Sequence, residues 1–264
     1  MKLMDVKLLV SAILALPFVS VAAVECGDTI TTAEILTEDI LNCGSTPALT
    51  IEGPTGSLDL NGFTLECGGG AAIGIEVLGN SAVLSNGMID GCNIGIFVNG
   101  DGFHSVQSMT VQDGLSTGIW LVSENNIVNG STVTGAFDRG IDLNGANNSA
   151  IGNSLVDNLG APFSGITISG DNAFVAQNFC DDNNEGGIVI EPSSGGLVVQ
   201  NIVTNNGQAG ISMEGGNQSN YLVTGNIATG NPDGDLVDPN PDACMSTNIW
   251  YGNIFDTADP SCLE

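Results

Sequence analysis

Basic residues are almost absent from this 264-residue chain. Lys and Arg together number 3 against 30 Asp and Glu, and the formal net charge is −27. Proteins that bind nucleic acid or anionic membranes use Lys and Arg to displace counterions. We therefore expect neither nucleic acid nor, once the export signal described below is removed, a membrane as a partner. A polyuronate would also be repelled, unless Ca²⁺ bridged the carboxylates.

Long helical patterns are missing as well. Within the repeats no stretch holds an apolar 3.6-residue period over three turns, so helix is expected at most as a short cap over residues 32–41. The one long apolar run, residues 8–18, is too short for a membrane span. It follows Lys2 and Lys7 and precedes small residues, which is typical of an export signal over residues 1–23. The sequence predicts a secreted, extracellular protein that keeps Arg139 as its only Lys or Arg.

The chain does contain an internal repeat with a period of about 23 residues. Its first mark is a recurring Gly-Ile pair, at Gly74-Ile75, Gly95-Ile96, Gly118-Ile119, Gly140-Ile141, Gly165-Ile166, Gly187-Ile188 and Gly210-Ile211, with Gly234-Asp235-Leu236 as a degenerate last copy. Such a period indicates structural units that stack on one another and share one continuous core.

A second register, about half a repeat further on, places mostly side-chain amides in one column. Its members are Asn61, Asn86, Met109, Ser131, Asn153, Asn178, Asn201, Asn226 and Asn253. The residue three positions before each member of this column is apolar, beginning with Leu58, Val83 and Val106. The residue two positions after each member carries neither a charge nor an amide, beginning with Phe63 and Met88. We expect the amides to sit at a turn and to bond to one another from coil to coil.

Strand and turn signals fill the repeats, since short alternating apolar segments are separated by Gly, Asn, Asp and Ser. A leucine-rich repeat would need Leu-x-x-Leu-x-Leu and a helical return segment, and neither is present. The sequence therefore predicts an all-β, right-handed parallel β-helix, a solenoid of about nine coils. The expected organisation is an N-terminal cap at 24–50, repeats at 51–231, and a last coil with a C-terminal cap at 232–264.

Seven cysteines fit an oxidising compartment. Cys67 and Cys92 occupy the same place on adjacent coils and are expected to form a disulfide; Cys26 with Cys43 could close the first turn, and Cys244 with Cys262 the last. Cys180 falls in an apolar column, where a small buried hydrophobe is the favoured interpretation over a reactive thiol. Asn129, Asn147 and Asn217 fit the N-glycosylation pattern, which has meaning only in a eukaryotic glycoprotein.

Several of these motifs resemble secreted members of the pectin-lyase-like, right-handed parallel β-helix repeat family. They are the opening Leu58-Asp59-Leu60-Asn61-Gly62, the Gly-Ile-x-(Val/Leu/Ile) coils and the closing segment from Asn248 through Phe255. The resemblance covers about residues 45–264. It implies the fold but leaves the activity open, because the family includes lyases, hydrolases, epimerases, adhesins and members without assigned chemistry.

One outward column is expected to carry the functional surface. In each Gly-Ile coil the residue after Ile points outward, which gives Glu76, Phe97, Trp120, Asp142, Thr167, Val189 and Ser212. Phe97 and Trp120 would stack on sugar rings, with Glu76 and Asn144 bonding hydroxyls. The alternative is that both rings lie under a loop or a partner chain.

Candidate chemistry is confined to the coil of Arg139. Carbohydrate lyases that resemble this fold use a base to remove the proton α to a uronate carboxylate, and an Arg or a cation to neutralise that carboxylate. Arg139 together with Asp138 and Asp142 could carry out this reaction. The alternative is that Arg139 only forms an ion pair with Asp138 or Asp142. His104 is expected to be a turn residue. The Gly-His-Gly and Arg-Ile-Lys elements of polygalacturonases and the Asp-Pro-His-Asp motif of alginate epimerases are absent.

An acidic loop offers a candidate metal site. Asp233, Asp235, Asp238 and Asp242 alternate with Gly, Pro and Asn, an oxygen-rich composition suited to Ca²⁺, the one candidate cofactor. Solvated turn acids are the alternative. The leading hypothesis is a secreted β-helix that binds, and could cleave or modify, an extracellular polysaccharide, as a lyase, hydrolase or epimerase would. The rival is a non-catalytic structural or adhesive surface protein, and the oligomeric state is not indicated.

Overall fold

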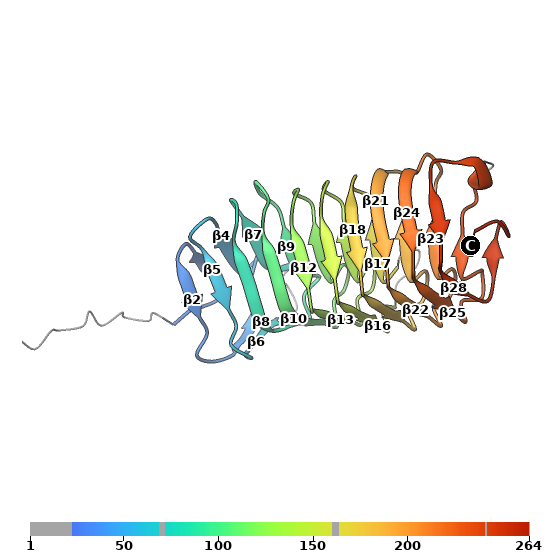
Figure 1. The fold of residues 1–264 in the computed structure, drawn as a ribbon. Helices are drawn as coiled ribbons and strands as arrows, with labels where there is room; N and C mark the ends of the chain where they lie inside the picture. Colours follow the sequence, from blue (N-terminus) through green and yellow to red (C-terminus); the bar gives the residue numbers. More distant parts are fainter. Residues whose placement is uncertain (1–22, 69–71, 160–163, 241, 264) are drawn as a thin grey trace, which may run out of the picture.

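The computed structural model describes residues 23–68, 72–159, 164–240 and 242–263, and it shows a rod of stacked coils (Figure 1). Every strand pairing is parallel and joins one coil to the next. One face of the rod is an eleven-stranded sheet. Its strands are β1 (Thr29–Ile30), β4 (Leu49–Glu52), β7 (Ile73–Leu78), β9 (Ile94–Val98), β11 (Ile119–Leu121), β14 (Ile141–Leu143), β17 (Ile166–Ile168), β20 (Ile188–Ile190), β23 (Ile211–Met213), β26 (Leu236–Val237) and β29 (Ala258–Asp259).

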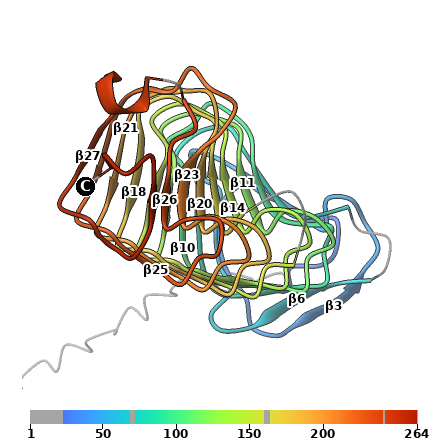
Figure 2. The same cartoon turned by 90° about the vertical axis from the view of Figure 1, so that its right-hand side faces the viewer.

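Two further faces complete each coil, as the view along the rod shows (Figure 2). The second face contains β2 (Ala33–Ile35), β5 (Ser57–Asp59), β12 (Ile127–Asn129), β15 (Ser149–Ile151), β18 (Ala173–Ala176), β21 (Ser194–Val199), β24 (Ser219–Thr224) and β27 (Ile249–Tyr251). The third contains β3 (Ile40–Cys43), β6 (Thr64–Cys67), β13 (Thr132–Thr134), β16 (Ser154–Val156), β19 (Phe179–Asp181), β22 (Ile202–Thr204), β25 (Ile227–Thr229) and β28 (Ile254–Phe255). The long strands β8 (Val83–Asp90) and β10 (Ser105–Gln112) run through both faces. The predicted parallel β-helix is confirmed.

The Gly-Ile pairs form the core side of the first face. Their isoleucines pair in register and are fully buried, as Ile75, Ile96, Ile119, Ile141, Ile166, Ile188 and Ile211. The preceding glycines are needed for packing. A Cβ at Gly118 would lie 2.3 Å from Val133 Cγ1 and 2.7 Å from the Gly140 carbonyl oxygen. The Gly-Ile repeat therefore reflects two requirements, a buried isoleucine and a preceding residue without a side chain.

The predicted amide column is present from Asn153 to Asn253. Each side-chain N–H donates to the next Oδ1 along the rod, with N···O distances of 3.0 Å from Asn153 to Asn178 and 2.9 Å at the later rungs. The same amide also donates to a backbone carbonyl, for example from Asn201 to Val175 at 3.0 Å. The ladder satisfies polar groups that the turn would otherwise bury unpaired.

In the first two coils the predicted amide register is wrong. Asn61 and Asn86 are exposed, at φ values of 51° and 58°, a left-handed conformation that Asn tolerates. The inward residue that pairs with Met109 is Gly87, and a Cβ at Gly87 would lie 2.2 Å from Cβ of Leu60. Leu60 and Gly87 thus fill the corner with apolar contact instead of amides.

The apolar column beside it shifts by one residue in the same coil. Leu84, and not Val83, pairs with Leu58 and Val106, whereas Val83 faces outward with 37% of its surface exposed. Ile89, and not Met88, is also inside this coil, where it pairs with Leu65; Leu65 is fully buried two residues after the predicted Phe63. Because side chains alternate across a strand, a shift of one residue exchanges the core for the solvent face.

A second amide ladder follows the third face and was not predicted. It comprises Asn158, Asn183, Asn206 and Asn231, whose side-chain N–H groups each donate to the next rung at 2.8–3.0 Å. Asp235 ends this ladder, because its Oδ1 accepts from the backbone N–H and the Nδ2 of Asn231.

The sheets continue into the N-terminal end of the rod. Residues 24–50, expected to be a cap, contribute β1, β2 and β3 to the sheets. The short helix expected at residues 32–41 is wrong, since β2 and the start of β3 occupy this segment. Within the described parts of the chain the one helical segment is a 3₁₀ turn, η1 (Ala243–Met245).

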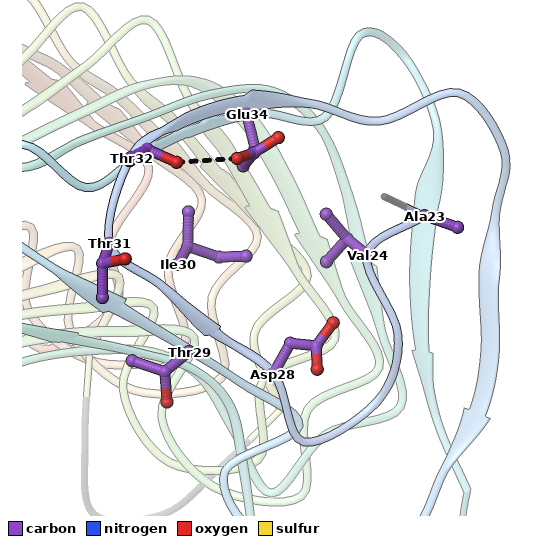
Figure 3. A pocket seen from close by; sticks show the side chains of 8 residues that line it. All are labelled: Ala23, Val24, Asp28, Thr29, Ile30, Thr31, Thr32 and Glu34. Atoms are coloured by element: carbon purple, nitrogen blue, oxygen red, sulfur yellow. Dashed lines mark hydrogen bonds between the residues drawn. The ribbon is translucent and has the colours of Figure 1, made fainter. Parts of the chain in front are cut away.

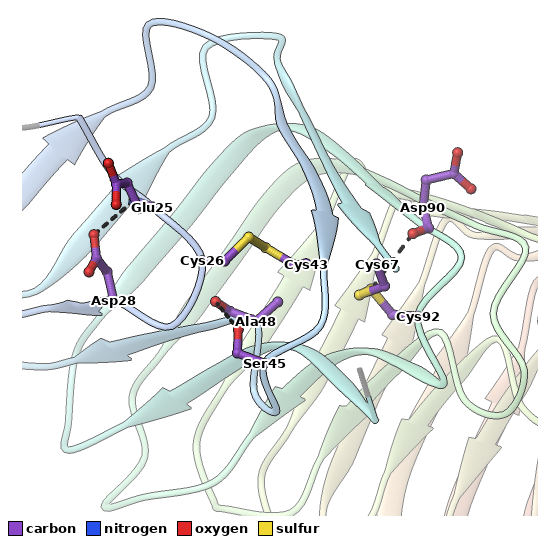
Figure 4. Close-up of a disulfide and its surroundings, with 9 residues drawn as sticks. All are labelled: Glu25, Cys26, Asp28, Cys43, Ser45, Ala48, Cys67, Asp90 and Cys92. Carbon is purple, nitrogen blue, oxygen red and sulfur yellow. Dashed lines mark hydrogen bonds between the residues drawn. A yellow bond between two sulfur atoms is a disulfide. The ribbon is translucent and has the colours of Figure 1, made fainter. Parts of the chain in front are cut away.

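All three expected disulfides form. Cα–Cα distances are 5.5 Å for Cys26–Cys43, 5.0 Å for Cys67–Cys92 and 5.8 Å for Cys244–Cys262, and Figure 4 shows the first two bridges close together at the N-terminal end. The thiol of Cys180 is fully buried in the core, as expected, and burial raises its pKa.

Candidate functional site

The outward column of the first face has the predicted register. Glu76 pairs with Phe97, Phe97 with Trp120, and Trp120 with Asp142 on successive strands β7, β9, β11 and β14. Glu76, Phe97 and Trp120 are half-buried and accessible, whereas Asp142 is only 1% exposed. The accessible part of the column is therefore its N-terminal half.

Further along the rod the column is covered, contrary to the expectation of an open face. Thr167, Val189 and Ser212 are all buried. Segments that lead into the strands lie over them: Ser164 Oγ hydrogen-bonds Thr167 Oγ1 at 2.9 Å, and a Cβ at Gly186 would lie 2.7 Å from Val189 Cγ2. A ligand on this face would contact the coils of β7 to β14.

Phe97 and Trp120 form an aromatic pair on this accessible part. Their ring centroids are 5.1 Å apart and the planes are tilted by 52°, a favourable aromatic arrangement. Asn99, two residues after Phe97, and Asn144, two residues after Asp142 on the coil next to Trp120, are exposed and offer amide groups near the rings. The indole Nε1 of Trp120 is buried and has no hydrogen-bond partner among the described residues. This face combines exposed ring surface with polar groups at its border.

Arg139 lies beside the aromatic pair and is held by two carboxylates. Its Nη1 is 3.2 Å from Asp142 Oδ2, and its Nη2 is 3.5 Å from Glu191 Oε1, two coils away. Ser169 Oγ donates to the other Glu191 oxygen at 2.7 Å. The alternative interpretation, in which Arg139 is paired with Asp138 or Asp142, is confirmed for Asp142, and Glu191 is a partner that sequence spacing did not indicate.

Two carboxyl groups near Arg139 have raised pKa values. Burial raises the pKa of Asp142 to about 6; Arg139 opposes the shift, while Glu191 and Asp138 add to it. Burial also raises the pKa of Asp138, against the effects of Arg139 and of a hydrogen bond with Ser116. The Oδ1 atoms of Asp138 and Asp142 are buried, and neither has a hydrogen-bond partner in the described part of the chain. Unpaired buried polar atoms of this kind concentrate at functional sites.

His104 lies directly before strand β10, outside any assigned turn, and is almost fully buried. Its Nδ1 accepts the backbone N–H of Ala82 at 3.1 Å, and its own N–H donates to Asn126 Oδ1 at 2.9 Å. Burial lowers the pKa of His104. The side chain is a rung between coils, far from the surface that a base would need.

The four acids of the predicted metal loop do not converge. Asp233 and Asp242 are exposed, and Asp235 is turned into the second amide ladder. Burial disfavours the charge of Asp235, but its hydrogen bonds from Asn231, Thr257 and Asp256 outweigh this and lower its pKa. Asp238 Oδ1 accepts from the neighbouring Asn240. No group of three or more His, Cys, Asp or Glu side chains among the described residues is placed to hold one ion.

The remaining predicted sites lie apart from the aromatic face. Asn147 and Asn217 are exposed, and Asn129 is half-buried. A cavity of about 290 Å³ opens at the N-terminal end of the rod, with Val24, Ile30 and Glu34 among its lining residues (Figure 3). It shares no residue with the face of Phe97 and Trp120.

The export signal predicted at residues 1–23 lies outside the described residues except for Ala23. In the portion that the structure describes, no helix has the length and apolar character needed to cross a membrane.

Comparisons with solved structures show the same fold in larger proteins. The periplasmic alginate epimerase AlgG has a TM-score of 0.61 and 14% identity over 87% of this chain and 61% of AlgG. The Dettilon tailspike protein has a TM-score of 0.65 and 15% identity over 87% of this chain and 48% of the tailspike. Pectate lyase Pel9A has a TM-score of 0.52 and 13% identity over 88% of this chain and 68% of the lyase. At such identities the similarity establishes the fold alone.

The chain thus spans less than two thirds of the length of AlgG and about half of the tailspike protein. No curated protein sequence matches it. The family model described as "Right handed beta helix region" matches residues 94–253, more than half of the chain. Together with the parallel coils, this match shows that the chain belongs to the right-handed β-helix family.

Proposed function

We propose that this protein is secreted and binds an extracellular polysaccharide on the face formed by β7, β9, β11 and β14. The observation that carries the proposal is the accessible ring pair of Phe97 and Trp120, 5.1 Å apart on adjacent strands. Sugar rings have apolar faces that pack on aromatic side chains, while their hydroxyls need polar partners at the border of the contact. Glu76, Asn99 and Asn144 are placed to supply those partners.

Two further observations support the proposal. The three disulfides fit the oxidising compartment that a secreted protein meets. Proteins of the same fold include an alginate epimerase and a pectate lyase, whose names refer to polysaccharide substrates. The fold is thus compatible with a polysaccharide laid across successive coils, although fold alone does not assign the ligand.

Catalytic modification is a second candidate, favoured by one observation. Asp142 has a pKa raised to about 6 and a buried Oδ1 without a partner, and both properties suit a general base near neutral pH. Against it, Asp142 is 1% exposed, and Arg139 is engaged by Asp142 and Glu191. A substrate would have to displace these contacts before either side chain could act. We therefore rank binding above catalysis.

The binding proposal is tested with Phe97→Ala and Trp120→Ala in a glycan array and in calorimetric titrations of the polysaccharides that the array identifies. Each loss of a stacking ring should weaken binding by about 10-fold, corresponding to about 1–1.5 kcal/mol. Phe179→Ala is the matched control, because Phe179 is a 38%-exposed aromatic residue on the third face. Equal affinities for the wild type and both face variants would refute the proposal.

The catalytic candidate is tested by mass spectrometry after incubation with neutral and uronate polysaccharides. Unsaturated or water-added fragments that disappear in Asp142→Asn would establish an enzyme at this site. Intact polymers with the wild-type protein, in a preparation that binds them, would assign a binding role alone.

A further inference from the structure

We infer that the glycan bound on this face is cationic, a polysaccharide whose amino sugars carry ammonium groups, and not a polyuronate. The inference rests on the proposed polysaccharide binding and adds the chemical class of the ligand.

Carboxylates stand at both ends of the ring pair. Along the rod the column reads Glu76, Phe97, Trp120 and Asp142, with each residue in register with the next. Adjacent strands are about 4.8 Å apart, so the two acidic positions are separated by about 14 Å, with both rings between them. A polymer lying across the rings along the rod therefore meets the accessible carboxylate of Glu76 at one end and the buried Asp142, paired with Arg139, at the other.

Arg139 does not reverse this balance. Three acids surround it, namely Asp138, Asp142 and Glu191, and two of them contact its guanidinium directly. One positive charge among three carboxylates leaves this end of the face negative. A uronate carboxylate placed here would compete with Asp142 and Glu191 for the guanidinium of Arg139. Like charges at such distances disfavour binding.

A metal bridge would be the other way to hold a uronate. It needs several converging oxygen ligands from the protein. No group of three or more acidic, His or Cys side chains meets this condition in the described parts of the chain. The face thus offers a uronate neither an uncommitted cation nor an evident metal site.

A cationic sugar matches the aromatic pair and the accessible carboxylate of the face. Its ammonium group is attracted to the negative faces of Phe97 and Trp120 by cation–π interaction, and Trp provides the strongest such surface. Glu76, half-buried beside Phe97, supplies a counter-charge. The net charge of −27 also raises the local concentration of cationic polymers around the protein.

The test compares three oligosaccharides of equal length by calorimetry at pH 7.5. They are a quaternised (N,N,N-trimethyl) glucosamine oligomer, which is cationic at every pH, the neutral N-acetylglucosamine oligomer and an oligogalacturonate. At low salt the cationic oligomer should bind about 10-fold more tightly than the neutral one. In 1 M NaCl this ratio should fall to about 2-fold, because a short Debye length screens the carboxylates.

Variants separate local recognition from general attraction. Glu76→Gln should reduce the cationic-to-neutral ratio by about 3-fold, whereas Glu38→Gln, which removes the same charge from an exposed site near the N-terminal end, should leave it unchanged. Trp120→Ala should weaken binding of both oligomers. A neutral or uronate oligomer that binds as tightly as the cationic one, or an equal response to Glu76→Gln and Glu38→Gln, would overturn the inference. Failure of all three oligomers together with no hit on the glycan array would instead overturn the proposed function.

Discussion

Replacing Asn201 with Ala should remove one rung of the first amide ladder and destabilise the rod. Asn201 is fully buried. Its Nδ2 donates to the Val175 carbonyl at 3.0 Å and to Asn226 Oδ1 at 2.9 Å. Its Oδ1 accepts both the backbone N–H and the Nδ2 of Asn178, each at 2.9 Å. One side chain therefore satisfies polar groups on two neighbouring coils.

The cost follows from the groups that Ala would leave behind. Asn178 Nδ2 keeps its bond to the Ala150 carbonyl, and Asn226 Oδ1 keeps the backbone N–H of residue 201. The backbone N–H of Asn178 and the carbonyl of Val175 lose the partner that Asn201 gave them. A buried N–H left without a partner costs about 1–3 kcal/mol and each further lost hydrogen bond about 0.5–1.5 kcal/mol, so the substitution should reduce the free energy of unfolding by about 3–4 kcal/mol. That is a large fraction of the stability of a typical domain.

Equilibrium urea unfolding measures this loss, with Trp fluorescence and far-UV circular dichroism as two probes, because long repeat arrays can unfold in parts. Gln200→Ala is the control: Gln200 precedes Asn201, is exposed, and should change the free energy of unfolding by less than about 0.5 kcal/mol. If Asn201→Ala costs no more than Gln200→Ala, the ladder does not stabilise the coils and the reasoning is wrong.

Three further predictions concern single groups. Asp142→Asn removes a carboxyl group whose pKa is raised by burial from its ordinary value of 3.8 to about 6. Because the wild type loses stability as this group ionises with rising pH, the free energy of unfolding of the variant should gain up to about 3 kcal/mol relative to the wild type between pH 4 and pH 7. Urea unfolding measures this difference, and a difference that does not change with pH would contradict the prediction. Replacing both Cys67 and Cys92 by Ser removes a disulfide that joins residues with a sequence separation of 25. This should lower the free energy of unfolding by about 3.5 kcal/mol, because the unfolded chain gains conformational entropy, and an unaltered urea midpoint would contradict the prediction. Cys180, fully buried with a pKa raised by burial, should react with a thiol reagent at least about 100-fold more slowly in the native protein than in urea, and equal rates would refute its buried position.

The periodic part of the fold could be predicted because it depends on local pattern. The Gly-Ile pairs and the later Asn rungs repeat at nearly constant spacing, and each repeat must bury the same face against its neighbour. The aromatic column of Phe97 and Trp120 followed from the same alternation. These features place side chains on a face and require no knowledge of what covers that face.

The first two coils show where the pattern misleads. Asn61 and Asn86 have the residue type of the ladder, yet both are exposed at positive φ, and Leu60 and Gly87 take the interior position. Residue type alone cannot separate an Asn that bonds inside a turn from an Asn that merely tolerates a left-handed backbone. The second ladder was missed for a related reason: its four rungs are confined to the later coils, and its last partner is an Asp.

For this protein the sequence determined the stacked coils, the buried isoleucine column, the Cys67–Cys92 disulfide and the register of the outward residues, because these follow from periodicity and alternation along the chain. The tertiary structure alone decided that the outward column is accessible at Trp120 and buried at Asp142, and that Arg139 bridges Asp142 and Glu191. Accessibility and ion pairing depend on segments from other coils that fold over the strands, and those contacts leave no regular spacing in the sequence.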